Sequence, residues 1–223
     1  MKDTPSLIAF DLDGTLVDSV PDLTRAINGM LVECNLAVRS RESIKGWIGN
    51  GAQVLVKRAL TGEMEGEVDT TVFDSAYQLF LKYYASNLSH NSVLYDDVES
   101  TLALFKRAGV SLACVTNKPS KFTEPLLVEL GIRSLFDYIV CGDTFEKRKP
   151  HPMPLLETAH FFGAVAAESI MVGDSINDIA AAQAAGFLSI CVDYGYSGGY
   201  DVHELGADRV ISQFSQLEQL LLG

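Results

Sequence analysis

Short apolar runs recur along the chain, each closed by polar or glycine residues. They cover 7–10, 110–115, 138–141, 170–172, 188–192 and 210–211. Stretches with helical spacing separate the later runs, at 98–108, 120–130, 153–162 and 176–185. A glycine follows each stretch, as at a helix C-terminus, namely Gly109, Gly131, Gly163 and Gly186. Continuous apolar strands that alternate with helices predict a parallel sheet covered on both faces.

The connection between the first two runs breaks this rhythm. The first run ends at Phe10 and the second begins near Val110, although a crossover needs only a dozen or more residues. Segments such as "VPDLTRAINGMLVECNL" have helical spacing, and no strand-like alternation occurs before about Ser86. We therefore predict an α/β fold, a Rossmann-like doubly wound parallel sheet core with an inserted helical cap domain. The predicted core comprises 1–18 and 87–223, and the predicted cap 19–86.

The net charge of the chain limits the classes of ligand that it is expected to bind. The 223 residues carry 29 acidic and 17 basic side chains, a formal net charge of -12. Such a surface repels phosphate backbones, so no nucleic-acid partner is expected. A site for any small anion then needs local positive charge from a metal ion, a lysine or backbone N–H groups.

Cysteine usage and hydropathy indicate the compartment. The four cysteines are far apart in sequence and include no CxxC pair, so neither a disulfide framework nor a zinc site is expected. The N-terminal apolar run breaks after four residues, unlike a secretory signal. No segment approaches the roughly 20 apolar residues that span a bilayer. A cytoplasmic location without membrane association is expected.

Polar side chains follow four of the apolar runs. In order along the chain they are Asp11, Asp13, Gly14 and Thr15; Thr116, Asn117 and Lys118; Lys149; and Asp174, Ser175, Asn177 and Asp178. Each alone has an ordinary interpretation as a turn or helix-cap residue. Ligands of open parallel sheets bind at the carboxyl ends of the strands, where all these residues would meet. The set therefore predicts one active site.

The chemistry that this set favours is phosphoryl transfer through an aspartyl phosphate. Asp11 would be the nucleophile. Because one anion must attack another, a Mg²⁺ ion held by Asp11 and Asp174 is expected between them. Asp13 would protonate the leaving group and then deprotonate water.

The remaining residues would support these steps. Lys149, Thr116, Asn117 and the Gly14–Thr15 amides would hold the transferring oxygens. Asp178 would orient a metal-bound water or Lys149, with Ser175 beside it in a supporting position. Asp18 lies where the chain leaves the core, and a hinge, helix-start or supporting catalytic role all fit it.

Four ordered motifs, "DLDGTLVDS", "VTNK", "KRKPHP" and "GDSINDIAAAQAAG", resemble those of the phosphatase branch of the haloacid dehalogenase superfamily. The resemblance covers essentially the whole chain. It implies Asp11 as nucleophile, Asp13 as acid and base, Thr116 as phosphate binder, Lys149 as the lysine of the third motif and Asp174 as magnesium ligand. It also implies that the Asp13 backbone carbonyl contacts the metal. The second aspartate of "DLD" argues against dehalogenation.

Two further stretches point to a substrate. "GWIGNGAQVLVKRAL" and "VDYGYSGG" are similar to segments of phosphoglycolate phosphatases, which implies hydrolysis of 2-phosphoglycolate and a place in carbohydrate metabolism. The carboxylate of that substrate needs a cation or an amide nest in the cap. Arg58, Lys45 and the amides of Gly49–Gly51 are the candidates, although a helical cation is also typical of a solvated face.

Other functions stay open at this point. The same core serves phosphosugar mutases of the beta-phosphoglucomutase type and phosphatases for other small phosphoesters. A non-catalytic binding module fits least, because every catalytic position is filled. The expected partner is a small phosphorylated metabolite, and the sequence does not predict the oligomeric state.

Overall fold

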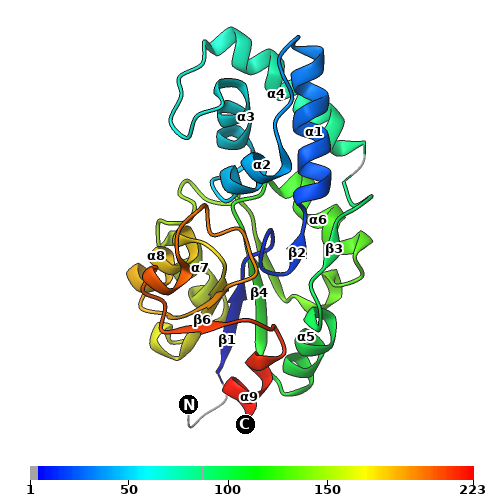
Figure 1. Ribbon diagram of the computed structural model, residues 1–223. Coiled ribbons are helices and arrows are strands. Elements are labelled where there is room, and N and C mark those ends of the chain that lie inside the picture. The colour runs from blue at the N-terminus through cyan, green and yellow to red at the C-terminus, as the bar shows by residue number, and fades with distance from the viewer. Residues whose placement is uncertain (1–4, 87) are drawn as a thin grey trace.

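The computed structural model describes residues 5–86 and 88–223, so residues 1–4 and 87 of the predicted core lie outside the described residues. Six strands form one parallel sheet in the order β5-β4-β1-β6-β7-β8 (Figure 1). They are β1 (Leu7–Phe10), β4 (Ser111–Val115), β5 (Tyr138–Val140), β6 (Ser169–Gly173), β7 (Leu188–Val192) and β8 (Arg209–Ile211). The predicted α/β fold class is confirmed.

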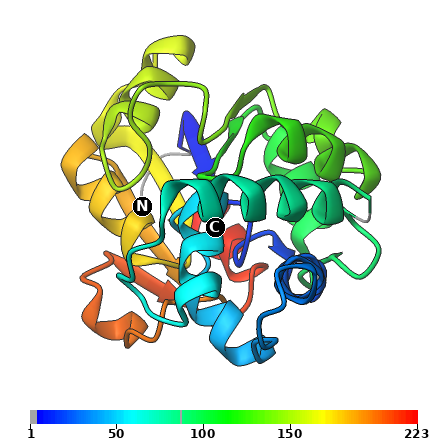
Figure 2. The same cartoon turned by 90° about the horizontal axis from the view of Figure 1, so that it is seen from above.

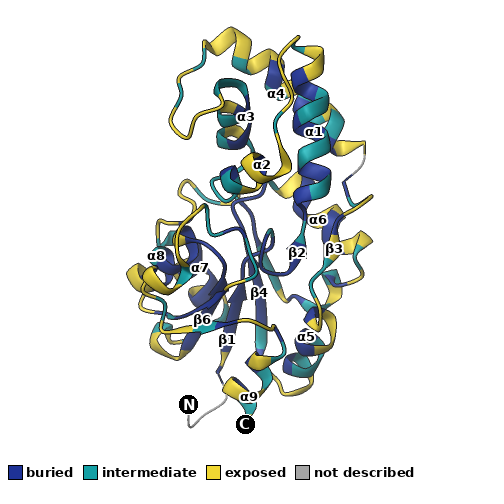
Figure 3. Cartoon of the chain, viewed as in Figure 1, coloured by how far each residue is buried: buried dark blue, intermediate teal, exposed yellow. Residues whose placement is uncertain are grey.

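Helices cover both faces of the sheet, and side-chain alternation along the strands explains why. Ile8 and Phe10 of β1 belong to one hydrophobic cluster, and Leu7 and Ala9 to another. The first cluster includes α5 (Val98–Arg107), α6 (Ser120–Glu129) and α9 (Gln216–Leu222), and the second includes α7 (Met153–Phe162) and α8 (Ile176–Ala185). The four central strands, β4, β1, β6 and β7, are therefore almost wholly buried, whereas the edge strands β5 and β8 are only partly buried (Figure 3).

In the described part of the connection between β1 and β4, four helices precede α5. They are α1 (Val20–Glu33), α2 (Arg41–Trp47), α3 (Ala52–Thr61) and α4 (Thr70–Ala85). Local signals start and stop them: Pro21 opens α1, Asp69 Oδ1 accepts the Thr71 N–H at the start of α4, and Gly62 ends α3 with φ of 79°. Seen from above, α1 is viewed end-on and α4 lies across the view (Figure 2).

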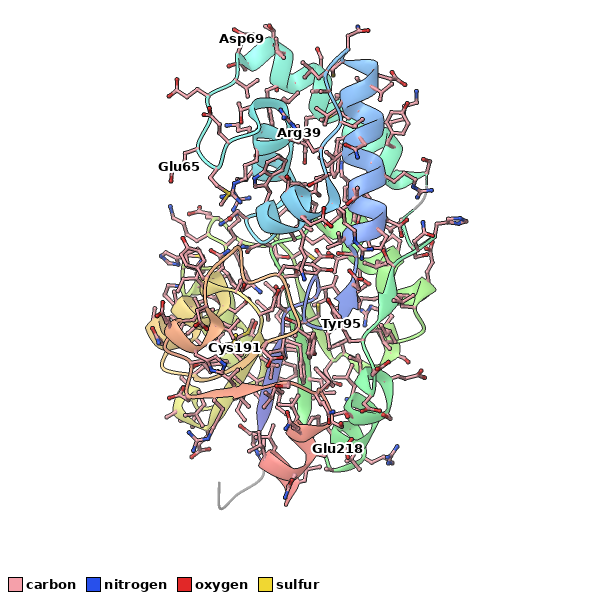
Figure 4. All side chains as sticks on the ribbon, viewed as in Figure 1. Arg39, Glu65, Asp69, Tyr95, Cys191 and Glu218 are labelled. Carbon is pink, nitrogen blue, oxygen red and sulfur yellow. The ribbon has the colours of Figure 1, made fainter. Side chains whose placement is uncertain are left out.

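Arg39 fastens this helical part together (Figure 4). Its Nε donates to Ala59 O at 3.0 Å and its Nη2 to Leu60 O, so it binds the last turn of α3. Its backbone N–H donates to Asn28 Oδ1 of α1 at 2.9 Å. Arg39 thus links α1, through its backbone, to α3, through its side chain.

The two chain segments that join the helical part to the sheet run side by side. β2 (Val17–Asp18) pairs antiparallel with β3 (Val93–Leu94), a pairing that the sequence pattern did not predict. Next to this pair, Asp22 is fully buried and accepts the N–H groups of Asn91 and Ser92, each at 2.8 Å. Three short 3-10 helices, η1 (Arg133–Leu135), η2 (Ala166–Glu168) and η3 (Val202–Glu204), complete the chain. Across 5–86 and 88–223, no helix is both long and apolar enough to cross a membrane.

Candidate active site

The carboxyl ends of three adjacent strands bring the central residues of the site together. Asp11 follows β1, Thr116 follows β4 and Asp174 follows β6, and β1 pairs with both of the other strands. Lys149 arrives from the loop after β5 and is 2% exposed. The sheet therefore gathers residues that are up to 163 positions apart in sequence.

Lys149 is the positive centre of this group. Its Nζ lies 2.9 Å from Asp11 Oδ1 and 2.7 Å from Asp178 Oδ1. It also donates to the Val115 carbonyl at the end of β4. Burial lowers the pKa of Lys149, but Asp11 and Asp178 outweigh burial and raise it, so the ammonium stays charged.

Asp178 is saturated by donors. Besides Lys149 at Oδ1, its Oδ2 accepts the Ser175 hydroxyl at 2.6 Å, the Ser175 N–H at 3.1 Å and the Asp174 N–H at 3.3 Å. These bonds form the first turn of α8 and fix the Asp174 backbone. Asp178 and Ser175 therefore support the Asp174 backbone, and Asp178 contacts Lys149 directly.

Asp174 lies in a close-fitting cradle. Its Oδ1 accepts from Thr15 Oγ1 at 3.1 Å and its Oδ2 accepts the Tyr196 N–H at 2.6 Å. A Cβ on Gly14 would come within 2.2 Å of Oδ2, and one on Gly195 within 2.3 Å of the Asp174 Cβ. Gly14 also has φ of 91°, which an L side chain disfavours. Only glycine fits at these two positions.

The acidic cluster fits a divalent cation. Oxygens of Asp11, Asp174 and Asp178 lie within 4.8 Å of one another, and Lys149 is the single cation in contact with them among the described residues. Three carboxylates against one ammonium leave two negative charges uncompensated. Burial raises the pKa of Asp11 to about 6 and that of Asp174 well above its usual value. Hard carboxylate oxygens in excess negative charge are the donor set that Mg²⁺ prefers.

Asp13 lies beside this cluster with partners of its own. Its Oδ1 accepts from Ser19 Oγ at 2.6 Å, and Lys118 Nζ lies 3.0 Å from Oδ1 and 3.1 Å from Oδ2. Lys118 also donates to the hydroxyl of Tyr84 on α4. Burial lowers the pKa of Lys118, but Asp13 and Tyr84 outweigh it and raise it.

A cavity opens between these residues and the helices above them. We call its sheet side the floor, formed by Asp11, Asp13, Thr116, Asn117 and Lys118. Its helical side, which we call the roof, is formed by Leu23, Ile48, Ala52, Leu55 and Phe80. Tyr84, Phe122, Pro119, Gly49 and Gly51 complete the lining. The floor is polar and charged, whereas the roof is apolar.

Comparison with known proteins agrees with this geometry. Residues 8–192 match the haloacid dehalogenase-like hydrolase family. The chain belongs to this family. The resemblance that the four motifs indicate is therefore confirmed.

Relatives in the family are similar over nearly their whole length. A phosphoglycolate phosphatase of Nitrosococcus oceani is 44% identical over 221 residues, which cover 99% of this chain and 98% of the relative. One of Colwellia psychrerythraea is 44% identical, covering 95% and 94%. The crystal structure of a predicted phosphoglycolate phosphatase from Haemophilus somnus 129PT is 38% identical, has a TM-score of 0.93 and covers 99% of both chains.

Two groups of residues that the sequence predicts to contact the substrate form hydrogen bonds within the protein. The backbone N–H of Gly14 donates to Val17 O at 2.9 Å and that of Thr15 to Leu12 O at 3.3 Å. Both amides thus form hydrogen bonds within the turn, and their contact with phosphate oxygens stays a prediction. The tight turn after "DLD" uses them internally, and Thr15 serves the site through its hydroxyl.

Arg58 belongs to the second of these groups, and its hydrogen bonds lie within the helical part. Its Nη1 donates to Trp47 O at 2.9 Å and to Asn50 Oδ1 at 3.0 Å, and its Nε donates to Met64 O. Arg58 does not line the cavity. It binds the loop 49–51 through Asn50, and its contact with a substrate stays a prediction. Lys45 is similarly occupied, with its Nζ 5.5 Å from the centroid of the Tyr196 ring.

Asn117 joins the floor to the roof. Its Nδ2 donates to Gly49 O and to Lys149 O, each at 2.9 Å, while its buried Oδ1 has no hydrogen-bond partner within the described part of the chain. A buried acceptor without a donor is costly, so a ligand or water donor is expected there.

Sequence reasoning assigned no role to two further residues, Lys118 and Tyr196. Lys118 has a visible signal, because it directly follows Thr116 and Asn117 at the same strand end. Tyr196, in the "YGY" stretch, accepts the Ser19 N–H at 2.8 Å through its hydroxyl, which itself lies 2.9 Å from Asp18 Oδ1. Asp18 Oδ2 in turn pairs with Arg41 at 3.1 Å. Asp18 thus belongs to the junction of the two parts.

Proposed function

We propose that the protein is a magnesium-dependent phosphatase that hydrolyses 2-phosphoglycolate to glycolate and phosphate through an aspartyl phosphate on Asp11. The observation that carries the proposal is that Asp11, on the floor of the cavity, is buried in contact with Lys149 and close to Asp174, while a second carboxylate, Asp13, lies beside it on the same floor. Relatives at 44% identity that are named phosphoglycolate phosphatases support the substrate.

The first step transfers the phosphoryl group to the protein. An oxygen of Asp11 attacks phosphorus, and the bond from phosphorus to the glycolate oxygen breaks. Asp13 gives its proton to that oxygen, so glycolate leaves as the alcohol. Lys149 neutralises one charge of the acidic cluster, and the Thr116 hydroxyl, which lines the cavity, donates to a phosphoryl oxygen.

The second step restores the protein. Asp13, now a carboxylate, takes a proton from a water molecule that attacks phosphorus, and the bond from phosphorus to Asp11 breaks. Asp11 and Asp174 would hold the Mg²⁺ with their side chains, and Asp13 with its backbone carbonyl. When bound, the ion offsets the repulsion between carboxylate and phosphate. Asp178 and Ser175 hold Lys149 and the Asp174 backbone in position.

The helical part has a separate task in this proposal. Residues 19–86 form a cap on a core made of 1–18 and 87–223, and the cap keeps water from the aspartyl phosphate until glycolate has left. The apolar roof supports this task. A cytoplasmic role in carbohydrate metabolism belongs to the same proposal, and the four free cysteines support a reducing compartment.

Replacing Asp11 with Asn tests the covalent mechanism. The variant keeps the shape of the side chain and removes the nucleophile, so we expect turnover to fall about 10⁴-fold or more while the protein stays folded. Mass spectrometry of acid-quenched wild-type protein should detect one added phosphoryl group that D11N lacks. D74N makes the same chemical change at an exposed position of α4 and should keep full activity. Full activity of D11N would refute the mechanism.

A substrate comparison tests the rest. Release of inorganic phosphate is measured with 2-phosphoglycolate and with glucose 1-phosphate, each with and without EDTA. The proposal expects rapid, EDTA-sensitive release from 2-phosphoglycolate. Conversion of glucose 1-phosphate to glucose 6-phosphate without phosphate release would indicate a mutase instead.

A further inference from the structure

Lys118 is a buried cation whose position the two chemical steps do not explain. It is 5% exposed, and its ammonium is held between Asp13 on the core and Tyr84 on the helical part. The Tyr84 ring also lies against it, with the centroid 4.8 Å from Nζ. Burying a lysine is costly, and these contacts fix the ammonium at one point of the cavity wall.

Some substrates carry a second anionic group besides their phosphate, and among the described residues only Lys118 provides a cationic side chain for it in the cavity. Within the part of the chain that the structure describes, Lys118 is the one lysine or arginine that lines it. The roof is apolar, and the two cap cations that the sequence offers as candidates, Arg58 and Lys45, have partners outside the cavity. A carboxylate carried by the substrate therefore finds its counter-charge in the core and not in the cap.

The distance between Lys118 and Asp13 matches one substrate class. In 2-phosphoglycolate the carboxylate and the phosphate-bearing oxygen are attached to the same carbon. Lys118 Nζ and the Asp13 carboxylate are one hydrogen bond apart, at 3.0 Å. A carboxylate held by Lys118 thus brings the bridging oxygen next to Asp13, the group that protonates it.

Resting on the proposed function, we propose that Lys118 is the residue that selects phosphate esters of 2-hydroxy acids by binding their carboxylate. Selectivity then comes from the strand end that carries Thr116. The roof contributes shape and excludes water. Esters that lack the carboxylate lose the contact with Lys118 but keep every contact to the phosphoryl group.

The test compares two esters of equal length in two variants. In Lys118→Met, kcat/KM for 2-phosphoglycolate should fall about 10- to 100-fold more than kcat/KM for ethyl phosphate, as expected for the loss of a charge-assisted hydrogen bond. Any loss common to both esters reports the contact of Lys118 with Asp13. Lys121→Met is the control. Lys121 is exposed near the start of α6, and its substitution removes the same charge. It should leave the ratio unchanged.

A second measurement needs no variant. Wild-type protein should hydrolyse 2-phosphoglycolate at least 10-fold more efficiently than its neutral amide, carbamoylmethyl phosphate. Equal kcat/KM of wild-type protein for 2-phosphoglycolate and carbamoylmethyl phosphate would overturn the proposal even if Lys118→Met failed to fold. An equal loss on both substrates in Lys118→Met, or an equal ratio change in Lys121→Met, would overturn it as well. If wild-type protein released no phosphate from 2-phosphoglycolate but did so from ethyl phosphate, the proposed function itself would be wrong.

Discussion

The floor and the roof of the cavity are built by different rules. Every polar side chain of the floor follows a strand, and Asp11, Lys149, Asp13 and Lys118 form two adjacent ion pairs. The roof consists of apolar side chains on or directly next to helices. The loop 49–51 beside it contacts the floor through the backbone carbonyl of Gly49, which accepts from Asn117. The sheet edge therefore fixes the chemistry, and the helices fix the volume in which it happens.

This difference has an energetic side. The floor keeps like charges buried close together, which costs stability unless a cation joins them. The roof buries apolar surface, which favours the folded state without any ligand. We therefore expect the floor to respond strongly to metal and the roof to respond hardly at all.

After the loss of the nucleophile in Asp11→Asn, the largest effect is expected from removing another carboxylate of the acidic cluster next to the floor, that of Asp174. Asp174→Asn should lower turnover about 10²- to 10³-fold, because a ligand of the cation is lost. Mg²⁺ should raise the melting temperature of wild-type protein, and this shift should vanish in the variant. In EDTA the variant should be no less stable than wild type, because one of three mutually repelling charges is gone.

Thermal denaturation with and without Mg²⁺ measures both quantities. D74N, the exposed control, should keep the wild-type metal shift. A full Mg²⁺ shift in D174N would show that the cation binds elsewhere.

The floor was largely predictable from the sequence, and the reason is physical. A strand followed by Asp, Thr or Lys in a parallel sheet can deliver that side chain to one edge only. Asp11, Thr116, Lys149 and Asp174 are therefore predicted from the apolar runs that they follow, and the structure brings them together.

The roof was not predictable in the same way. Helical spacing indicates that a segment is helical, but the direction of a cationic side chain depends on nearby acceptors. Arg58 binds three oxygens that come from a turn and a loop of its own helical part, which no spacing predicts. The β2–β3 pairing was missed as well, because two-residue strands carry too little pattern.

The comparison is sharpened by adding one methyl group next to Asp174, at Gly195, and another in the helical part, at Gly46. In Gly195→Ala the new Cβ would lie 2.3 Å from the Asp174 Cβ and 2.6 Å from the Gly14 carbonyl, where backbone leaves no room. We expect a loss of about 1–3 kcal/mol in the free energy of unfolding, with weaker Mg²⁺ binding. In Gly46→Ala, inside α2, nothing lies within 4 Å of the new Cβ. That change should stabilise by about 0.5–1 kcal/mol.

Chemical denaturation measures both values, and Mg²⁺ titration measures the effect on the metal. Equal behaviour of the two variants would contradict the close packing around Asp174.

The smallest expected effect concerns the polar link between the two parts. Asn177, on the first turn of α8, donates to Gly49 O at 3.3 Å and accepts from Asn50 Nδ2 at 3.3 Å, so it holds the loop 49–51 against the core. Asn177→Ala should cost about 1 kcal/mol in the free energy of unfolding. It should also raise KM by less than about tenfold without a large change in kcat, because the roof is held less firmly and the floor is untouched.

Gln183→Ala supplies the matched control on the same helix. Gln183 Nε2 donates to Gly206 O at 2.9 Å. This is also a hydrogen bond from a side-chain amide to a backbone carbonyl, but neither residue lines the cavity. Its loss should cost a similar free energy of unfolding and leave KM unchanged. Steady-state kinetics and chemical denaturation of both variants separate the link to the roof from general stability. A fall in kcat as large as that of Asp174→Asn would mean that the loop 49–51 takes part in the chemistry, and the division between floor and roof would no longer hold.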